Sequence, residues 1–245
     1  MALQPWRTGI ISRIEDETYN TKRFWIEVPE LETFDFEPGQ FVTLDLPIHE
    51  KPNKRWRSYS IASWPDNTNT FELLIVLLDG GPGSTYMFNE VVVGSALRLR
   101  GPQGVFVLPR PIEQDLFMIC TGTGIAPFRS MANHIKRHHI PHKNLYLIFG
   151  TRSQRDLLYT AEMRELEKTL AGFYFMPTLS REQWEGCCGY VHGVYEKLIA
   201  EHTVNGALPD AQFLLCGWKA MVDEAKQRLL TAGYDKKQIH LELYG

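Results

Sequence analysis

Residues 116–130, LFMICTGTGIAPFRS, decide how the chain is organised. Residues 116–120 form a short uninterrupted apolar run, which is typical of a strand buried on both faces. A glycine-bearing turn follows at residues 121–124, and Pro127 then opens a segment with apolar residues at helical spacing. Strand, turn and helix together place backbone N–H groups at one point, which suits a nucleotide pyrophosphate. Because the full GxGxxG pattern is missing, a strand-to-helix turn without a ligand is an equally good interpretation of these residues alone.

After this stretch the chain alternates strand and helix patterns. The expected strands are residues 116–120, 145–149, 173–176, 213–216 and 239–243, and the expected helices are residues 128–138, 160–170, 191–201 and 218–232. That alternation predicts an α/β domain at residues 111–245, with a doubly wound five-stranded parallel sheet. If the strand order is 3-2-1-4-5, the ends of the first and fourth strands flank the switch point where ligands bind in such sheets.

Before this stretch the chain contains short strand-like runs broken by turn residues. They are residues 8–14, 21–28, 40–46, 58–62, 70–77 and 96–101. Their spacing predicts an antiparallel six-stranded β-barrel at residues 1–110. Residues 83–85, Gly-Ser-Thr, are expected to cap a short helix at residues 86–90. The fold class is therefore two-domain, β followed by α/β.

Composition narrows the class of protein. The chain of 245 residues has a formal net charge of −3 and a pI near 6.2, which argues against a nucleic-acid-binding protein. No apolar run approaches the roughly 20 residues of a membrane span, and the N-terminal residues do not resemble a secretory signal. Four cysteines form neither a disulfide framework nor a metal-cluster spacing, so we expect a cytoplasmic protein. His134 and His138 are one helical turn apart, but no ligand set completes them, and no metal site is predicted.

Two motifs in the barrel half extend the analysis to function. Residues 57–63, RSYSIAS, and residues 80–85, GGPGST, resemble the two flavin-phosphate elements of the ferredoxin–NADP(+) reductase family. The similarity continues in the family's order at residues 121–127, 180–182, 216–217 and 242–244. It thus covers nearly the whole chain, and its occurrence in sequence makes chance a poor explanation.

The resemblance implies a flavin held by the barrel half. The implied flavin-binding residues are Arg57, Ser58, Tyr59, Ser60, Gly83, Ser84, Thr85 and Tyr244. An arginine can fork two hydrogen bonds onto a phosphate, and a tyrosine can lie along a ring system with its hydroxyl free to bond. A second phosphate site favours FAD over FMN. From the residues alone, a barrel strand with an outward arginine and a packed tyrosine stays open, as does a simple helix cap at residues 83–85.

The resemblance also implies a nicotinamide coenzyme bound to the second half. The implied residues are Thr121, Gly122, Thr123, Gly124, Ser180, Arg181, Cys216 and Gly217. Ser180 and Arg181 follow the third strand, where an arginine suits the 2′-phosphate of NADPH. NADH stays possible, because Ser-Arg also occurs in NADH-using relatives. Tyr190 can stack on adenine or belong to the core, and Cys216 can be a small buried hydrophobe.

Three residues are implied in catalysis, namely Ser60, Cys216 and Glu242. Ser60 would donate to the central flavin nitrogen, while the thiol and the carboxylate would stand beside the nicotinamide. Tyr244 would stack on the flavin. The chain departs from the family's pattern there, because Gly245 follows the tyrosine.

The function that the resemblance implies is electron transfer between NAD(P)H and a separate carrier through FAD. Ferredoxin, flavodoxin or another separate redox protein is the expected partner, because no cysteine set for an iron–sulfur cluster lies in this chain. An NADH-dependent reductase component of an oxygenase is the alternative within the same class. A non-catalytic nucleotide-binding regulatory module is the alternative from another class.

Overall fold

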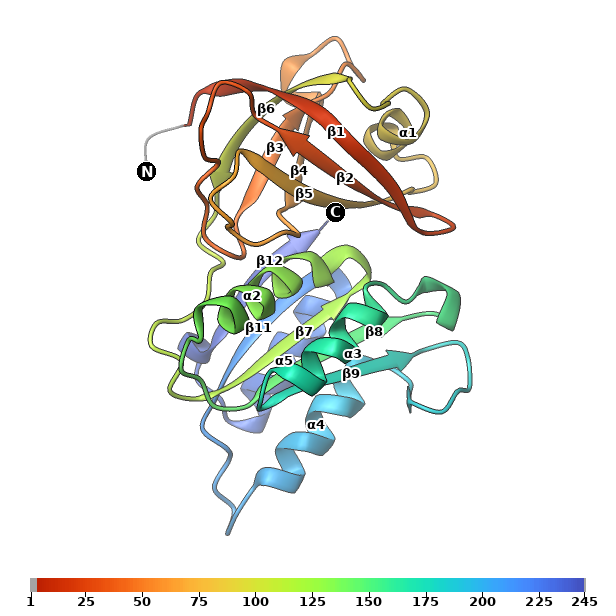
Figure 1. Ribbon diagram of the computed structural model, residues 1–245. Helices are drawn as coiled ribbons and strands as arrows, with labels where there is room; N and C mark the ends of the chain where they lie inside the picture. The colour runs from red at the N-terminus through yellow and green to blue at the C-terminus, as the bar shows by residue number, and fades with distance from the viewer. Residues whose placement is uncertain (1–3, 245) are drawn as a thin grey trace. The chain divides into compact units, whose positions relative to one another are not determined.

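The computed structural model describes residues 4–244, apart from the side chain of Tyr244 (Figure 1). The chain divides into two compact units. The first comprises Met1–Val107 together with Arg129–His134, and the second comprises Leu108–Phe128 with Ile135–Gly245.

Six antiparallel strands and one helix build the first unit. They are β1 (Trp6–Thr18), β2 (Thr21–Glu27), β3 (Phe41–Asp45), β4 (Trp56–Ser60), β5 (Thr70–Val76), α1 (Pro82–Asn89) and β6 (Ala96–Gln103). The sheet order is β4-β3-β6-β1-β2-β5, and an antiparallel bridge between Ile61 and Leu73 joins its two edges. The predicted six-stranded antiparallel barrel is confirmed, with alternate side chains of each strand buried in one core.

Helix α1 starts earlier than the sequence predicted. It begins at Pro82 with Gly81 as its N-cap, and proline fits this position because no hydrogen-bonded amide is lost. Ser84 therefore lies inside the first turn and is not the cap. Its hydroxyl accepts a hydrogen bond from the amide of Leu78 at 3.0 Å and donates one to the carbonyl of Gly81 at 3.1 Å.

A parallel sheet forms the centre of the second unit. Its strands are β7 (Asp115–Thr121), β8 (Leu145–Thr151), β9 (Phe173–Leu179), β10 (Cys187–Cys188), β11 (Ala211–Trp218) and β12 (Ile239–Tyr244). The order β10-β9-β8-β7-β11-β12 contains the predicted 3-2-1-4-5 arrangement. The additional strand, β10, is two residues long and pairs with the end of β9, too short to produce a periodic signal in the sequence.

Helices follow the strands as predicted. They are α2 (Ile125–His138), α3 (Thr160–Thr169), α4 (Val191–His202) and α5 (Lys219–Ala232). Helices α4 and α5 pack on the sheet face that carries Phe117, Ile148 and Phe213. Among residues 4–244, no helix is both long and apolar enough to span a membrane.

Candidate functional site

Strand β4 carries the motif predicted to hold the flavin. Tyr59 packs against the barrel core, and burial raises the pKa of its hydroxyl to about 12 while the nearby Arg57 opposes the shift. The hydroxyl therefore stays protonated and can donate near neutral pH. Ser60 is buried, at 3% exposure. Ser58 points to the other face of the strand, where its hydroxyl lies 3.0 Å from that of Thr43.

Arg57 and the start of α1 lie together, although 26 positions separate Arg57 from Gly83 in the sequence. The Arg57 guanidinium donates to the carbonyls of Lys54 at 3.1 Å and Trp56 at 2.7 Å. A Cβ added at Gly83 would lie 2.8 Å from Cγ of Arg57, so only glycine lets the arginine cross the first turn of the helix. A guanidinium beside the free N–H groups of a helix start is a suitable site for a diphosphate. The residues present therefore fit the phosphates of FAD.

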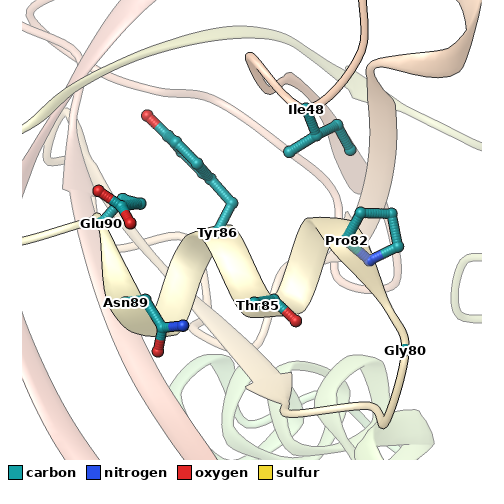
Figure 2. A pocket seen from close by; sticks show the side chains of 7 residues that line it. All are labelled: Ile48, Gly80, Pro82, Thr85, Tyr86, Asn89 and Glu90. Carbon is teal, nitrogen blue, oxygen red and sulfur yellow. The ribbon is translucent and has the colours of Figure 1, made fainter.

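A pocket of about 400 Å³ runs along α1 beside this site. It is lined by Ile48, Gly80, Pro82, Thr85, Tyr86, Asn89 and Glu90. Figure 2 shows the ring of Tyr86 rising from the helix on the side of Ile48 and Pro82. Of these lining residues, Thr85 is one that the sequence predicts as a flavin contact, whereas Ile48 and Tyr86 are not, because the loop before β4 and the helix meet only in the folded chain.

The glycine turn meets the end of the fourth sheet strand, as the sequence predicted. A short 3₁₀ turn, Gly122–Gly124, connects β7 directly to α2. A Cβ on Gly124 would lie 2.4 Å from the carbonyl oxygen of Cys216, and the amide of Trp218 donates to the hydroxyl of Thr121 at 3.4 Å. The N-terminal amides of α2 therefore emerge where β7 and β11 end. This arrangement fits a coenzyme pyrophosphate.

Cys120, Cys216 and Glu242 form one row across three neighbouring strands. Cys216 pairs in register with Cys120 of β7 and with Glu242 of β12. Both cysteines are fully buried, and burial raises the pKa of the Cys120 thiol well above its ordinary value. The Oε2 atom of Glu242 is buried without a hydrogen-bond partner among the described residues, and burial raises the pKa of this carboxyl to about 7. An unpartnered carboxyl in this row is a candidate contact for a ligand.

The raised pKa of Glu242 gives a testable pH dependence. The pKa rises from 4.5 to about 7, so the folded protein keeps a proton that the unfolded chain loses between those two values. The stability that this proton linkage contributes is complete below about pH 4.5 and is lost as the pH rises through 7. We expect Glu242→Gln to gain stability relative to the wild type between pH 5 and pH 8. Urea unfolding of both proteins without cofactors measures the difference, and a constant difference across this range would contradict the assignment.

Two arginines lie at the ends of β8 and β9. The amide of Ser180 donates to the carbonyl of Thr151 at 3.0 Å, and the amide of Arg181 donates to the carbonyl of Arg152 at 3.0 Å. These bonds align the loops after the two strands, and both arginines are exposed. Ser180 and Arg181 are predicted from the sequence as coenzyme contacts, whereas Arg152 is not. Its position directly after the second sheet strand was the available signal.

The loop that follows Arg181 is held by its tryptophan. Trp184 donates from Nε1 to the carbonyl of Cys187 at 2.6 Å, and a Cβ on Gly186 would lie 2.4 Å from the Trp184 ring. Tyr190 is 74% exposed, which rules out the core interpretation of this residue. The side chain of Tyr244 lies outside the described residues, and its backbone pairs with Trp218. Within residues 4–244, no cluster of three or more His, Cys, Asp or Glu residues could hold a metal ion.

Comparisons with known proteins match each half of the chain to a nucleotide-binding oxidoreductase domain. The profile of the "Oxidoreductase FAD-binding domain" matches residues 9–108, and that of the "Oxidoreductase NAD-binding domain" matches residues 118–227. Ferredoxin--NADP reductase B of Sorangium cellulosum is 33% identical over 86% of this chain and 86% of its own length. The anthranilate 1,2-dioxygenase electron transfer component of Acinetobacter baylyi is 32% identical over 78% of this chain, but only over 53% of its own length.

Solved structures show the same architecture. A ferredoxin NADP+ reductase from Neisseria gonorrhoeae with bound FAD and NADP is 27% identical, with a TM-score of 0.81, over 97% of this chain and 98% of that one. The Amycolatopsis cytochrome P450 reductase GcoB is 25% identical, with a TM-score of 0.85, over 99% of this chain and 71% of that one. The chain is an NAD(P)H-dependent flavin oxidoreductase with FAD- and NAD(P)-binding domains. It belongs to the ferredoxin–NADP(+) reductase-like family of FAD- and NAD(P)-binding oxidoreductases.

Proposed function

We propose that this protein passes electrons between NADPH and a separate one-electron carrier, such as ferredoxin or flavodoxin, through FAD. In this proposal residues 1–110 bind FAD and residues 111–245 bind the coenzyme. When bound, the flavin accepts a hydride and releases single electrons, a chemistry that no side chain of the protein can supply. The protein's own residues bind and orient the flavin and the coenzyme, and they exclude water from the two rings. The observation that carries the proposal is the convergence of Arg57 on the first turn of α1.

Different residues of the first unit would bind different parts of FAD. Arg57 and the N-terminal amides of α1 would bind the diphosphate, and Gly83 makes room for both. Ser60 would donate to the ring from the end of β4, and Tyr59 would lie along it. The pocket beside α1 would take the adenosine half, with Tyr86 available to stack on adenine (Figure 2). A flavin with a single phosphate, FMN, would leave this pocket unused.

The residues of the second unit orient the coenzyme. The turn at residues 121–124 and the amides of α2 would hold the pyrophosphate. Cys216 is a small side chain that would leave room beside the nicotinamide, and Glu242 would place its carboxyl there. Arg152, Ser180 and Arg181 would face the adenosine end, where NADPH carries an additional phosphate.

NADPH is proposed because two arginines, not one, lie on the aligned loops after β8 and β9. A guanidinium gains two charge-assisted hydrogen bonds from a 2′-phosphate and nothing comparable from a hydroxyl. We expect Arg181→Ala to lower kcat/KM for NADPH by at least tenfold, since hydrogen bonds to charged groups contribute about 1.5–3 kcal/mol. The value for NADH should change little. Arg137→Ala, at an exposed arginine on α2, is the matched control. Equal losses with both coenzymes would show that Arg181 does not read the phosphate.

An NADH-dependent reductase component of an oxygenase is the second candidate function. Identities of 32% and 28% to a dioxygenase electron transfer component and to the glycine betaine monooxygenase reductase subunit of Pseudomonas aeruginosa favour it. The chain spans only 53% and 63% of those two proteins. A wild-type preference for NADH would select this candidate.

A further inference from the structure

Two arginines without an ionic partner lie side by side on the loops that follow β8 and β9. The amide of Arg181 donates to the carbonyl of Arg152 at 3.0 Å, so the two backbone segments are neighbours. Both side chains are exposed, and within residues 4–244 neither forms an ion pair with an acidic side chain. Like charges on adjacent backbone segments repel each other, which favours an anion that contacts both guanidinium groups.

The acidic residue next to this pair does not neutralise it. Glu182 follows Arg181 directly, yet its Oε2 atom accepts a hydrogen bond from the backbone amide of Gln154 at 2.9 Å. Gln154 is the first residue of a 3₁₀ turn, Gln154–Asp156, and the first amides of such a turn have no partner within it. Glu182 therefore supplies this partner from the neighbouring loop and leaves both arginines available for a ligand.

Four hydrogen bonds hold the loop after β8 against the loop after β9. The backbone amide and the hydroxyl of Ser180 both donate to the carbonyl of Thr151, at 3.0 and 3.2 Å. The other two are the bonds, given above, to the carbonyl of Arg152 and from the amide of Gln154. Only the Gln154 bond lies beyond Arg152 in the chain. Because exposed hydrogen bonds at the end of a paired segment open easily, losing Glu182 would let the segment around Arg152 move.

Alignment of the two loops matters most for a ligand that needs both arginines. A phosphate dianion can accept charge-assisted hydrogen bonds from two guanidinium groups at once, whereas a ribose hydroxyl cannot. A loop that is fixed before binding loses less conformational entropy when the ligand arrives, which favours affinity. Holding Arg152 beside Arg181 should therefore strengthen the binding of a 2′-phosphate and leave the rest of the coenzyme unaffected.

We propose that Glu182 is a positioning residue for coenzyme specificity: its bond to Gln154 fixes the loop that carries Arg152, so that Arg152 and Arg181 bind one 2′-phosphate together. This inference rests on the proposed function, which assigns NADPH as the coenzyme. It adds a residue that acts through another residue, and it predicts that the contributions of Glu182 and Arg152 to binding are coupled.

The test measures binding of 2′,5′-ADP and of 5′-AMP, which differ only in the 2′-phosphate, to the FAD-loaded protein by titration calorimetry. We expect Arg152→Ala to weaken 2′,5′-ADP binding about tenfold, because a charge-assisted contact to the phosphate is lost. Glu182→Ala should weaken it severalfold. Both variants should bind 5′-AMP as the wild type does.

Two further variants separate the hydrogen bond from the charge. Glu182→Gln keeps an oxygen that can accept the bond from Gln154, and it should bind 2′,5′-ADP at least as tightly as the wild type. Glu185→Ala removes an equal charge from an exposed position in the same loop and is the matched control. It should not weaken binding of either ligand. A Glu182→Gln protein as weak as Glu182→Ala would overturn the proposal.

A double-mutant cycle tests the coupling itself. In the Glu182→Ala background, Arg152→Ala should weaken 2′,5′-ADP binding by less than about threefold, because the arginine is no longer held in place. Additive losses in the double variant would show that the two residues act independently and would overturn the proposal. Equal losses of 2′,5′-ADP and 5′-AMP binding in Glu182→Ala would also overturn it, since they would show a purely structural role.

The outcomes distinguish this inference from the proposed function. A wild type that prefers 2′,5′-ADP to 5′-AMP, with the same preference in Glu182→Ala, would overturn the role of Glu182 alone. A wild type that binds 2′,5′-ADP no more tightly than 5′-AMP would overturn the assignment of NADPH and this inference with it. Anaerobic reduction of the bound flavin by either coenzyme tests the oxidoreductase activity separately.

Discussion

Arg57→Ala should be purified without the yellow colour of bound flavin. The variant loses the guanidinium that lies across Gly83 at the start of α1, and with it the charge-assisted contact to a phosphate. Hydrogen bonds to charged groups contribute about 1.5–3 kcal/mol each, and this arginine offers two. We therefore expect the Kd for FAD to rise by a factor on the order of 10² to 10⁴.

Flavin fluorescence during titration of the FAD-free protein measures this Kd. The matched control is Arg98→Ala, which removes an arginine from the same barrel but from its outer face. It should retain FAD at the wild-type affinity. If Arg57→Ala retains stoichiometric FAD with unchanged affinity, the phosphate site lies elsewhere.

Of the substitutions described here, Glu72→Gln should lower the free energy of unfolding the most. Glu72 on β5 is 2% exposed and accepts two hydrogen bonds from Arg23, at 2.7 and 3.1 Å. Arg129, itself 4% exposed, donates to the same carboxylate at 2.9 Å and to the carbonyl of Ala62 at 2.9 Å. Removing the central charge leaves two arginines poorly compensated. Breaking a buried ion pair in this way costs about 3–5 kcal/mol.

The control is an exposed counterpart on the second unit. Glu224 also accepts hydrogen bonds from an arginine, Arg228 at 2.8 and 3.0 Å, but lies on the surface of α5. Glu224→Gln should lower stability by less than about 1 kcal/mol. The urea midpoints of both variants, followed by circular dichroism, make the comparison. Similar midpoints for the two variants would show that the buried cluster contributes no more than a surface pair.

Much of the fold could be predicted because its signals are local and repeated. The buried strands of the parallel sheet are uninterrupted apolar runs, and the helices between them carry apolar residues at a constant spacing. Strand β10 was not predicted because a strand of two residues is too short to show alternating or continuous apolar positions. Helix α1 starts earlier than predicted because Pro82 occupies its first position, which places Ser84 inside the first turn and not at the cap.

The candidate site was predictable where a motif lies within a few consecutive residues, as at residues 57–60 and 121–124. The features that were missed combine residues far apart in the chain. Glu72 and Arg129 are 57 positions apart, and Gln154 and Glu182 are 28 positions apart. Arg152 becomes a candidate contact for the coenzyme only because the fold aligns its loop with that of Arg181. Such pairings depend on strand register, which no local pattern contains.

Anaerobic mixing of the FAD-loaded protein with NADPH, and separately with NADH, in a stopped-flow spectrometer tests the central claim most directly. We predict single-turnover bleaching of the absorbance of the oxidised flavin, faster with NADPH than with NADH at equal concentration. Subsequent addition of oxidised ferredoxin, at no less than two one-electron equivalents per flavin, should restore the flavin spectrum. A bound flavin that neither coenzyme reduces would contradict the account.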